Sequence, residues 1–323
     1  MPPPSPDPHD PAVPEQGFLP PDEVYRAAAP RLGAAGDPLV NPPEQGIAGW
    51  AHRTGMLLRR SARPLAMIFG LTHALPAITS GLLLRPFVPN LGTLDRLVSE
   101  GGWDRLLGRL IVVGLAYAAL LLLPQLVGYA AATYHATRQA AGLTVSIGQS
   151  LLYGLRRLLG LAAHQLVAYV LVGVAVAAVA MCCVGGAEYL GLVPTALVYV
   201  YLAMATALVG PAYLFERRNP IAASFRLFHA AFWPNAARLL LVGLTLLASS
   251  FVEVMVDEIG GWSAAALGVT TLRPLLAATG AALVVAVEVP LTMLLFSGVL
   301  ITYAERLGAE RRIDTSDLAT WLR

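Results

Sequence analysis

The chain has 323 residues, of which 56% are hydrophobic and 13% are charged, and its formal net charge is +2. Soluble domains usually carry about 25% charged residues, so this composition is typical of a protein whose side chains face hydrocarbon, where charge is costly. The small net charge and the scattered arginine clusters exclude a nucleic-acid-binding protein.

All of the basic residues are arginine, a bias typical of a GC-rich bacterial genome, and the absence of lysine excludes Schiff-base catalysis. Cys182 and Cys183 are neighbours in an apolar run, so we expect them to pack as small apolar side chains. The sequence contains no G-x-S-x-G, H-E-x-x-H or phosphate-loop motif. We therefore expect no enzyme activity, no metal and no cofactor.

Residues 1–45 are rich in proline and poor in large apolar side chains, as in PPPSPDPHDPAVP. Such a segment cannot bury enough surface to offset the entropy of ordering it. We expect a disordered N-terminal tail that acts as a solvated spacer or, alternatively, docks a partner through its proline-rich pieces.

Six apolar stretches follow, each close to the ~20 residues that a helix needs to cross a bilayer. They cover 64–84, 107–132, 158–184, 192–215, 236–257 and 275–303. The first is weakened by His73 and Pro76, and the fifth ends in three acidic residues. The sequence predicts an all-α polytopic bundle of six transmembrane helices over 46–307, followed by a cytoplasmic tail over 308–323.

The arginines alternate between crowded and sparse connections along the chain. One side of the predicted membrane holds Arg53, Arg59, Arg60, Arg63, Arg138, Arg156, Arg157, Arg217, Arg218, Arg226, Arg238, Arg306, Arg311, Arg312 and Arg323. The other side holds only Arg85, Arg96, Arg105, Arg109 and Arg273. Because basic residues concentrate in short cytoplasmic loops, we predict a bacterial inner-membrane protein with both termini in the cytoplasm.

Two arginine-rich connections contain amphipathic helical patterns. The first places an apolar stripe beside Arg156 and Arg157: Ile147, Leu151, Leu155 and Leu158. The second follows Arg217 and Arg218 and keeps Arg226 off its stripe: Ile221, Phe225, Phe228 and Phe232. We expect two interfacial helices whose arginines face lipid phosphates. The alternative is a pair of ordinary short helices packed on the inner end of the bundle.

The second pattern also has the residues of a helix start. Pro220 suits the first turn of a helix, where its missing N–H is not needed, and Asn219 suits the N-cap before it.

Polar side chains inside the predicted spans are candidates for an intramembrane site, because burying them in hydrocarbon is costly. Glu288, His73 and Gln125 each lie within three residues of a proline, which frees a backbone carbonyl. They could form a proton or cation site; alternatively, neighbouring helices satisfy them by hydrogen bonds. Gly154 and Gly160 indicate close helix packing.

Residues 210–244 resemble a group of bacterial six-span integral membrane proteins named after the membrane domain of glycerophosphoryl diester phosphodiesterase. The shared features are a span ending in Pro and Glu, an N-P step, an amphipathic helix and a Phe-Trp pair: Pro211, Glu216, Asn219, Pro220, Ser224, Arg226, Leu227, Phe232 and Trp233. The likeness extends more loosely over 50–312, although the segment after Tyr303, Glu305 and Arg306 departs from it. The phosphodiesterase catalytic domain is absent, so the resemblance implies an architecture and no hydrolase activity.

The sequence favours a non-catalytic membrane scaffold or accessory protein that engages lipids, or other membrane proteins, through its arginines. The alternative function is a transporter or permease component that uses Glu288 and His73 in a polar cavity.

Overall fold

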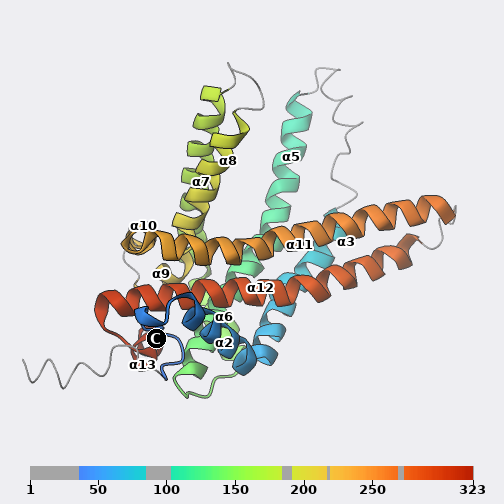
Figure 1. Ribbon diagram of the computed structural model, residues 1–323. Coiled ribbons are helices and arrows are strands. Elements are labelled where there is room, and N and C mark those ends of the chain that lie inside the picture. Colours follow the sequence, from blue (N-terminus) through green and yellow to red (C-terminus); the bar gives the residue numbers. More distant parts are fainter. Residues whose placement is uncertain (1–35, 85–102, 184–190, 217–218, 268–272, 323) are drawn as a thin grey trace, which may run out of the picture.

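The computed structural model describes residues 36–84, 103–183, 191–216, 219–267 and 273–322. Every regular element within these residues is a helix, so the all-α prediction is confirmed for the described part of the chain (Figure 1). The elements are η2 (Pro43–Gln45), α2 (Gly46–Phe69), η3 (Gly70–Ala74), α3 (Leu75–Leu84), α5 (Trp103–Tyr117), η5 (Ala118–Leu122), α6 (Leu123–Ala140), α7 (Ile147–Cys183), α8 (Leu192–Thr206), α9 (Val209–Phe215), α10 (Pro220–Ala230), α11 (Phe232–Leu267), α12 (Arg273–Arg311) and α13 (Thr315–Trp321).

Two helices widen into a π turn where a proline enters them. The π turn η3 joins α2 to α3, and the π turn η5 joins α5 to α6. A proline ring clashes with the carbonyl four residues earlier; for Pro76 and Pro124 those carbonyls belong to Thr72 and Leu120, which lie inside the two π turns. The wider turn accommodates the ring, so both helices continue past the proline.

Five helices in the described residues are long and apolar enough to cross a membrane: Ile111–Ala140, Ile147–Cys182, Leu192–Phe215, Phe232–Val252 and Val285–Arg311. They correspond to the second to sixth predicted stretches, and they give the chain the character of a multi-pass membrane protein. The first stretch, 64–84, is helical but is not one of the five. A sixth span therefore stays a prediction.

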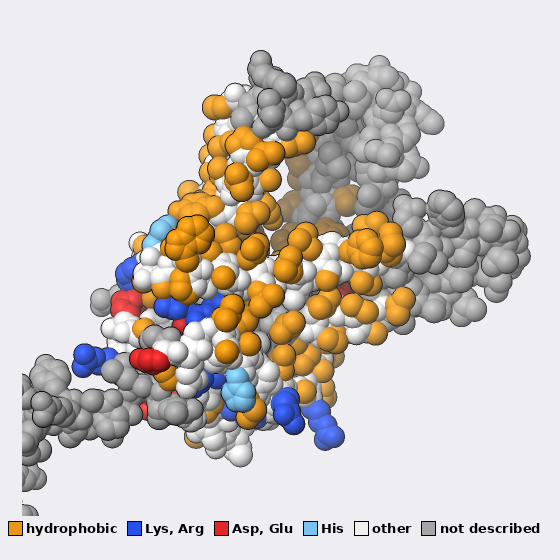
Figure 2. All heavy atoms as spheres, viewed as in Figure 1, with side chains coloured by type: hydrophobic (Ala, Val, Ile, Leu, Met, Phe, Trp, Pro, Cys, Tyr) orange, Lys and Arg blue, Asp and Glu red, His pale blue; other side chains and the backbone are white. Residues whose placement is uncertain are grey.

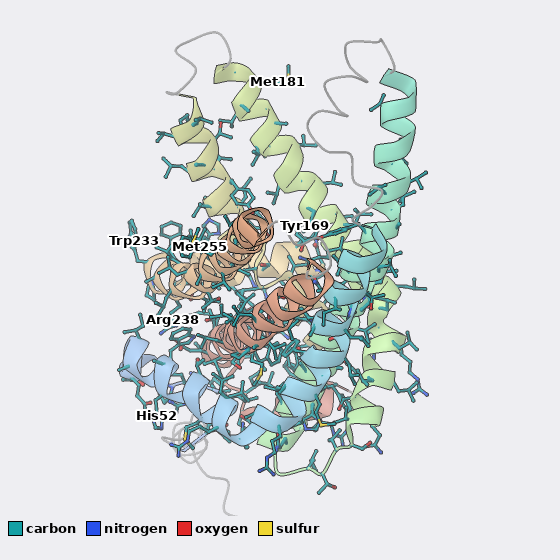
Figure 3. The ribbon with its side chains drawn as sticks, turned by 90° about the vertical axis from the view of Figure 1, so that its right-hand side faces the viewer. His52, Tyr169, Met181, Trp233, Arg238 and Met255 are labelled. Atoms are coloured by element: carbon teal, nitrogen blue, oxygen red, sulfur yellow. The ribbon has the colours of Figure 1, made fainter. Side chains whose placement is uncertain are left out.

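The long helices pair with their neighbours in the chain, α7 with α8 and α11 with α12 (Figure 1). The α11–α12 pair crosses α7 and α8 at a steep angle, as two views at right angles show (Figures 1 and 3). The predicted spans are therefore not six parallel helices, because these two pairs do not point in the same direction.

The first predicted interfacial helix is not a separate element. Residues 147–158 form the first turns of α7, which runs unbroken for 37 residues, or about 55 Å. Leu155 is 59% exposed, whereas the face that packs on α6 carries Ser150 and Gly154. Within the predicted apolar stripe, Ile147 and Leu151 pack on the core, whereas Leu155 is exposed.

The second predicted interfacial helix is α10, and it packs on α8 and α9. Asn219 caps it by accepting a hydrogen bond from the Ala222 N–H at 3.2 Å, and Pro220 occupies its first turn, as predicted. The Ser224 hydroxyl donates to the Ala205 carbonyl at 2.6 Å, and Phe228 is fully buried. This arrangement matches the alternative of a short helix packed on the bundle.

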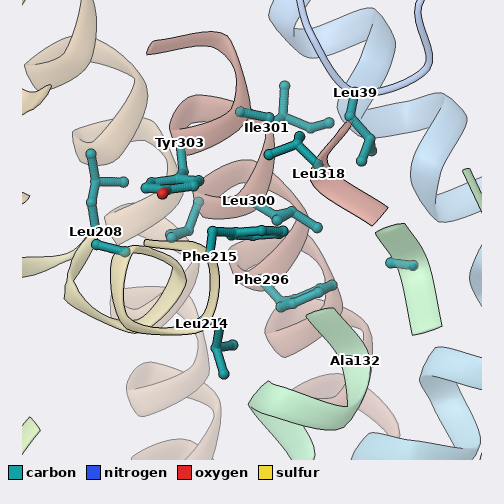
Figure 4. Close-up of a cluster of buried hydrophobic side chains, with 14 of the residues drawn as sticks. Leu39, Ala132, Leu208, Leu214, Phe215, Phe296, Leu300, Ile301, Tyr303 and Leu318 are labelled. Atoms are coloured by element: carbon teal, nitrogen blue, oxygen red, sulfur yellow. The ribbon is translucent and has the colours of Figure 1, made fainter. Parts of the chain in front are cut away.

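The folded part of the chain extends into both of the segments that the sequence predicts to be tails. Within the predicted N-terminal tail, residues 36–45 are folded, and Leu39 is fully buried; residues 1–35 lie outside the described part. Within the predicted C-terminal tail, α13 buries Leu318 close to Leu39 (Figure 4). The Asp37 carboxylate accepts hydrogen bonds from the Thr315 N–H at 3.0 Å and the Thr315 hydroxyl at 2.6 Å. The folded part therefore begins by residue 36 and includes α13.

The core lies where α9 and α12 meet the other helices (Figure 4). The Tyr303 ring stacks on Phe215 with centroids 5.4 Å apart, next to the fully buried Leu300. Away from this core, apolar side chains are exposed over α7, α8 and the α11–α12 pair, while charged side chains gather at the lower end of the molecule (Figure 2). Such a distribution suits a protein whose outer surface contacts lipid tails.

Candidate functional site

The charged end of the molecule contains a hollow of about 340 Å³ lined by two arginines. Its lining residues are Tyr134, Arg138, Thr144, Val145, Gln149, Leu152, Tyr153, Arg156 and Leu322. The Tyr134 and Tyr153 rings stack with centroids 4.5 Å apart, and the Arg138 guanidinium lies 5.2 Å from the centroid of Tyr134. We call this site the tyrosine hollow.

The two arginines of the tyrosine hollow differ in the contacts that they make within the protein. Arg138 donates from Nη1 to the Tyr134 hydroxyl at 3.2 Å, but its buried Nε has no hydrogen-bond partner. Arg156 is exposed at the mouth, and the guanidinium of its neighbour Arg157 lies 5.5 Å from the Tyr153 ring centroid. A guanidinium with free N–H groups binds phosphate or carboxylate oxygens.

Arg226, the predicted lipid-facing residue of α10, forms ion pairs within the protein. It lies 3.4 Å from Glu216 and 3.3 Å from Glu310, and Arg311 also pairs with Glu216. The Tyr303 hydroxyl donates to the same Glu216 carboxylate at 3.2 Å. These contacts tie the end of α9 to α10 and α12, so the charge of Arg226 is partly neutralised. Arg217 and Arg218 lie outside the described residues.

A buried ion-pair network lies beside this cluster, and its centre is Glu305. The Glu305 side chain is 0% exposed, and its Oε1 accepts hydrogen bonds from Arg238 Nη1 and Arg306 Nη2, each at 2.6 Å. Its Oε2 accepts from Asn41 Nδ2 at 2.9 Å. One carboxylate therefore joins the N-terminal segment, α11 and α12.

Arg53 extends the network toward the N-terminal segment. Its Nη1 donates to Asn41 Oδ1 at 2.7 Å and to Gln45 Oε1 at 2.6 Å, and its Nε donates to the Asp37 carbonyl at 3.1 Å. Burial lowers the pKa of Arg53 below its usual value, although the negative charges of Asp37 and Glu305 oppose this shift. The guanidinium keeps its charge because its ordinary pKa is so high.

The predicted intramembrane residues lie in helices that pack together. His73 is in η3, where its ring meets the edge of Phe69 with centroids 5.1 Å apart and its Nδ1 lies 3.3 Å from the Thr72 hydroxyl. The turn η3 packs against α6, which begins with Gln125 in its first turn, and against α12, which contains Glu288. Glu288 and Gln125 are each partly buried. Direct contact between Glu288 and His73 stays a prediction.

Arg238 and Arg306, which the sequence predicts to lie on the cytoplasmic side, pair with Glu305, and this pairing was not predicted. One signal was present, because Arg238 lies inside the apolar stretch 236–257, where a charge needs a partner. In the described residues, no group of three or more His, Cys, Asp or Glu side chains is placed to hold a metal ion.

Comparisons with known proteins give no family for this chain. No protein-family model, no curated protein and no solved structure matches it. The resemblance to the glycerophosphoryl diester phosphodiesterase membrane-domain group therefore stays a prediction, and the function has to be argued from the chain itself.

Proposed function

We propose that this protein is a non-catalytic integral membrane scaffold or accessory protein that engages anionic lipids through the arginines of its charged end. The proposal includes six spans in a bacterial inner membrane, with both termini and the charged end in the cytoplasm. Partner membrane proteins with acidic surfaces are the second class of ligand for the same arginines.

The observation that supports this proposal most is the surface of α7 around Arg156. Arg156 is exposed, and exposed leucines flank it on the same helix: Leu152, Leu155 and Leu159, the last 82% exposed. Apolar side chains next to a guanidinium match the boundary between lipid tails and phosphates. The tyrosine hollow adds Arg138 behind this surface, which gives a lipid phosphate two cations to contact.

The lipids that co-purify with the protein test the proposal. We expect Arg138→Gln with Arg156→Gln to lower the ratio of anionic to zwitterionic lipid retained in native nanodiscs. Each basic residue near an anionic surface contributes about 1 kcal/mol, or about fivefold in binding.

Arg59→Gln with Arg63→Gln is the matched control, because both arginines are exposed on α2 and this pair of substitutions removes the same two charges without touching the tyrosine hollow. An equal loss of anionic lipid in the control would mean that net charge, rather than this surface, selects the lipid. An unchanged ratio in the double variant would refute the proposal.

A transporter or permease component is the second candidate, and the π turns favour it. π turns occur frequently at functional sites, and here one of them contains His73 and packs against the helix that contains Glu288. Glu288→Gln should then abolish flux of protons or of a coupled solute in proteoliposomes while leaving the amount of inserted protein unchanged. A scaffold predicts no effect of this variant on any flux.

A further inference from the structure

A second hollow, of about 410 Å³, lies next to the Glu305 network and contains two of its arginines. Its lining residues are Gly46, Ile47, Pro234, Ala237, Arg238 and Arg306. Figure 3 shows Arg238 between α11 and the beginning of α2. We call this site the helix-start hollow, because α2 begins at Gly46 and α11 begins at Phe232.

Both arginines of the helix-start hollow have an N–H group without a partner. The Nε atoms of Arg238 and Arg306 are buried and make no hydrogen bond, although the Arg238 side chain is only 3% exposed. A buried donor without an acceptor costs about 1–3 kcal/mol, and more when it is charged. Two such donors on side chains that line one hollow indicate that a ligand with acceptor oxygens completes the site.

The charges around the helix-start hollow do not cancel. The network contains three guanidinium groups, of Arg53, Arg238 and Arg306, against the two carboxylates of Asp37 and Glu305. One positive charge of this network is left over beside the hollow. An anion would neutralise it.

The start of α2 also favours an anion in the helix-start hollow. Helix N-termini present N–H groups and positive partial charge, which together bind phosphate. The N-cap residue of α2, Gln45, makes no side-chain cap bond, so it supplies no acceptor for the N–H groups of the first turn. These groups lie beside Gly46 and Ile47, which line the hollow.

The walls of the hollow identify the anion as part of an amphipathic molecule. Ile47, Pro234 and Ala237 make its lining mainly apolar. Trp233, which is 79% exposed, adjoins it, and Leu241 and Leu244 continue outward along α11 from Ala237. Apolar walls do not stabilise a free phosphate ion. A phospholipid, in contrast, can place its phosphate on the arginines and its acyl chains along the leucines.

We propose that the helix-start hollow binds the phosphate of one anionic phospholipid, held by the guanidinium groups of Arg238 and Arg306. This inference adds a second, defined lipid site to the proposed function, and it does not depend on the tyrosine hollow. Its chemistry is noncovalent, so the lipid is a bound component and is not converted.

Filling the hollow tests the proposal without disturbing the buried ion pairs. Ala237 is exposed on α11 and lines the hollow, so Ala237→Phe places a ring where the headgroup would lie. Leu240→Phe is the matched control, because Leu240 is exposed on the same helix and does not line the hollow. Arg238→Gln is a second variant. Its lipid binding is interpreted only if its elution from a sizing column shows that it folds.

Delipidated full-length protein is titrated with phosphatidylglycerol, with phosphatidylethanolamine and with inorganic phosphate, and bound molecules are counted by native mass spectrometry. We expect one phosphatidylglycerol per chain in wild type and in Leu240→Phe, with at least tenfold weaker binding in Ala237→Phe.

Each other result of this titration contradicts the proposal in a different way. Saturable binding of inorganic phosphate alone would mean that the site takes a free anion. Equal binding of phosphatidylglycerol by wild type and Ala237→Phe would mean that the lipid lies elsewhere. A wild type that binds none of the three probes would overturn the inference while leaving the lipid ratio at Arg138 and Arg156 as a separate result.

Discussion

At the scale of single residues, Glu305 does most to decide how the helices join. Its carboxylate is fully buried and pairs with Arg238 and Arg306 while accepting from Asn41. Removing one partner of a buried ion pair leaves the other charge uncompensated, which costs about 3–5 kcal/mol. The residue is therefore a structural centre rather than a solvated charge at the end of a span.

Glu305→Gln keeps the shape of the side chain and removes its charge, so Arg238 stays buried without a counter-ion. We expect a loss of about 3–5 kcal/mol in the free energy of unfolding, measured by tryptophan fluorescence during heating in detergent. Glu310→Gln is the control, because Glu310 is 39% exposed and, among the residues that the structure describes, pairs with the half-exposed Arg226; such a pair contributes about 0–1 kcal/mol. Equal melting temperatures for the two variants would show that the Glu305 network does not stabilise the fold.

At the scale of elements, the sequence pattern predicts those features that depend on residues close together in the chain. The apolar stretches are helices, and the Asn219–Pro220 step starts α10, because both depend on neighbours within a few residues. The partners of Glu305 could not be predicted in this way. Asn41 is 264 residues away from it and Arg238 is 67 residues away, and no periodicity connects them.

The face of α7 that packs on the protein could not be predicted from its apolar residues alone. In water, apolar residues mark the face that packs on the protein; in lipid, an apolar face can equally point outward. On α7, Leu152, Leu155 and Leu159 are exposed while Leu161 is fully buried, and the small residues Ser150 and Gly154 pack on α6. The close packing that the sequence predicts at Gly154 is confirmed, and it marks a contact with α6 that the leucines do not mark.

Two glycines of α7 provide a direct test of this argument. A methyl group at Gly154 would meet the Val127 carbonyl oxygen and come within 3.2 Å of the Ala131 nitrogen, both of which are backbone atoms that cannot move alone. We expect Gly154→Ala to destabilise the protein by about 1–3 kcal/mol through overpacking of α6 against α7.

Gly173 lies on the same helix with nothing within 4 Å of an added methyl group. Gly173→Ala should be neutral or stabilising by up to about 1 kcal/mol, because alanine favours a helix. Thermal unfolding of the two variants in one detergent gives the comparison. A stabilising effect of Gly154→Ala would mean that α6 and α7 are farther apart than the structure has them.

At the scale of the whole molecule, the direction of the α11–α12 pair determines how many helices cross the membrane. The arginine distribution predicts that it crosses the membrane, yet it meets α7 and α8 at a steep angle (Figures 1 and 3). Transmembrane helices tilt by about 20° on average and rarely by more than about 40°. If α7 and α8 cross the membrane, the steep angle between the two pairs means that α11 and α12 have to reorient in order to cross it too.

Single cysteines introduced after replacement of Cys182 and Cys183 by alanine measure this topology with a membrane-impermeant maleimide. We expect Thr144→Cys and Thr320→Cys to react only from the cytoplasmic side, and Gly191→Cys only from the opposite side, because α7 separates these ends by about 55 Å. Arg273→Cys, at the first residue of α12, is the deciding position. Reaction from the outer side means that α11 and α12 cross, as six spans require. Reaction from the cytoplasmic side alone means that the pair lies along the membrane and that the helix-start hollow lies at the depth of the headgroups on that face.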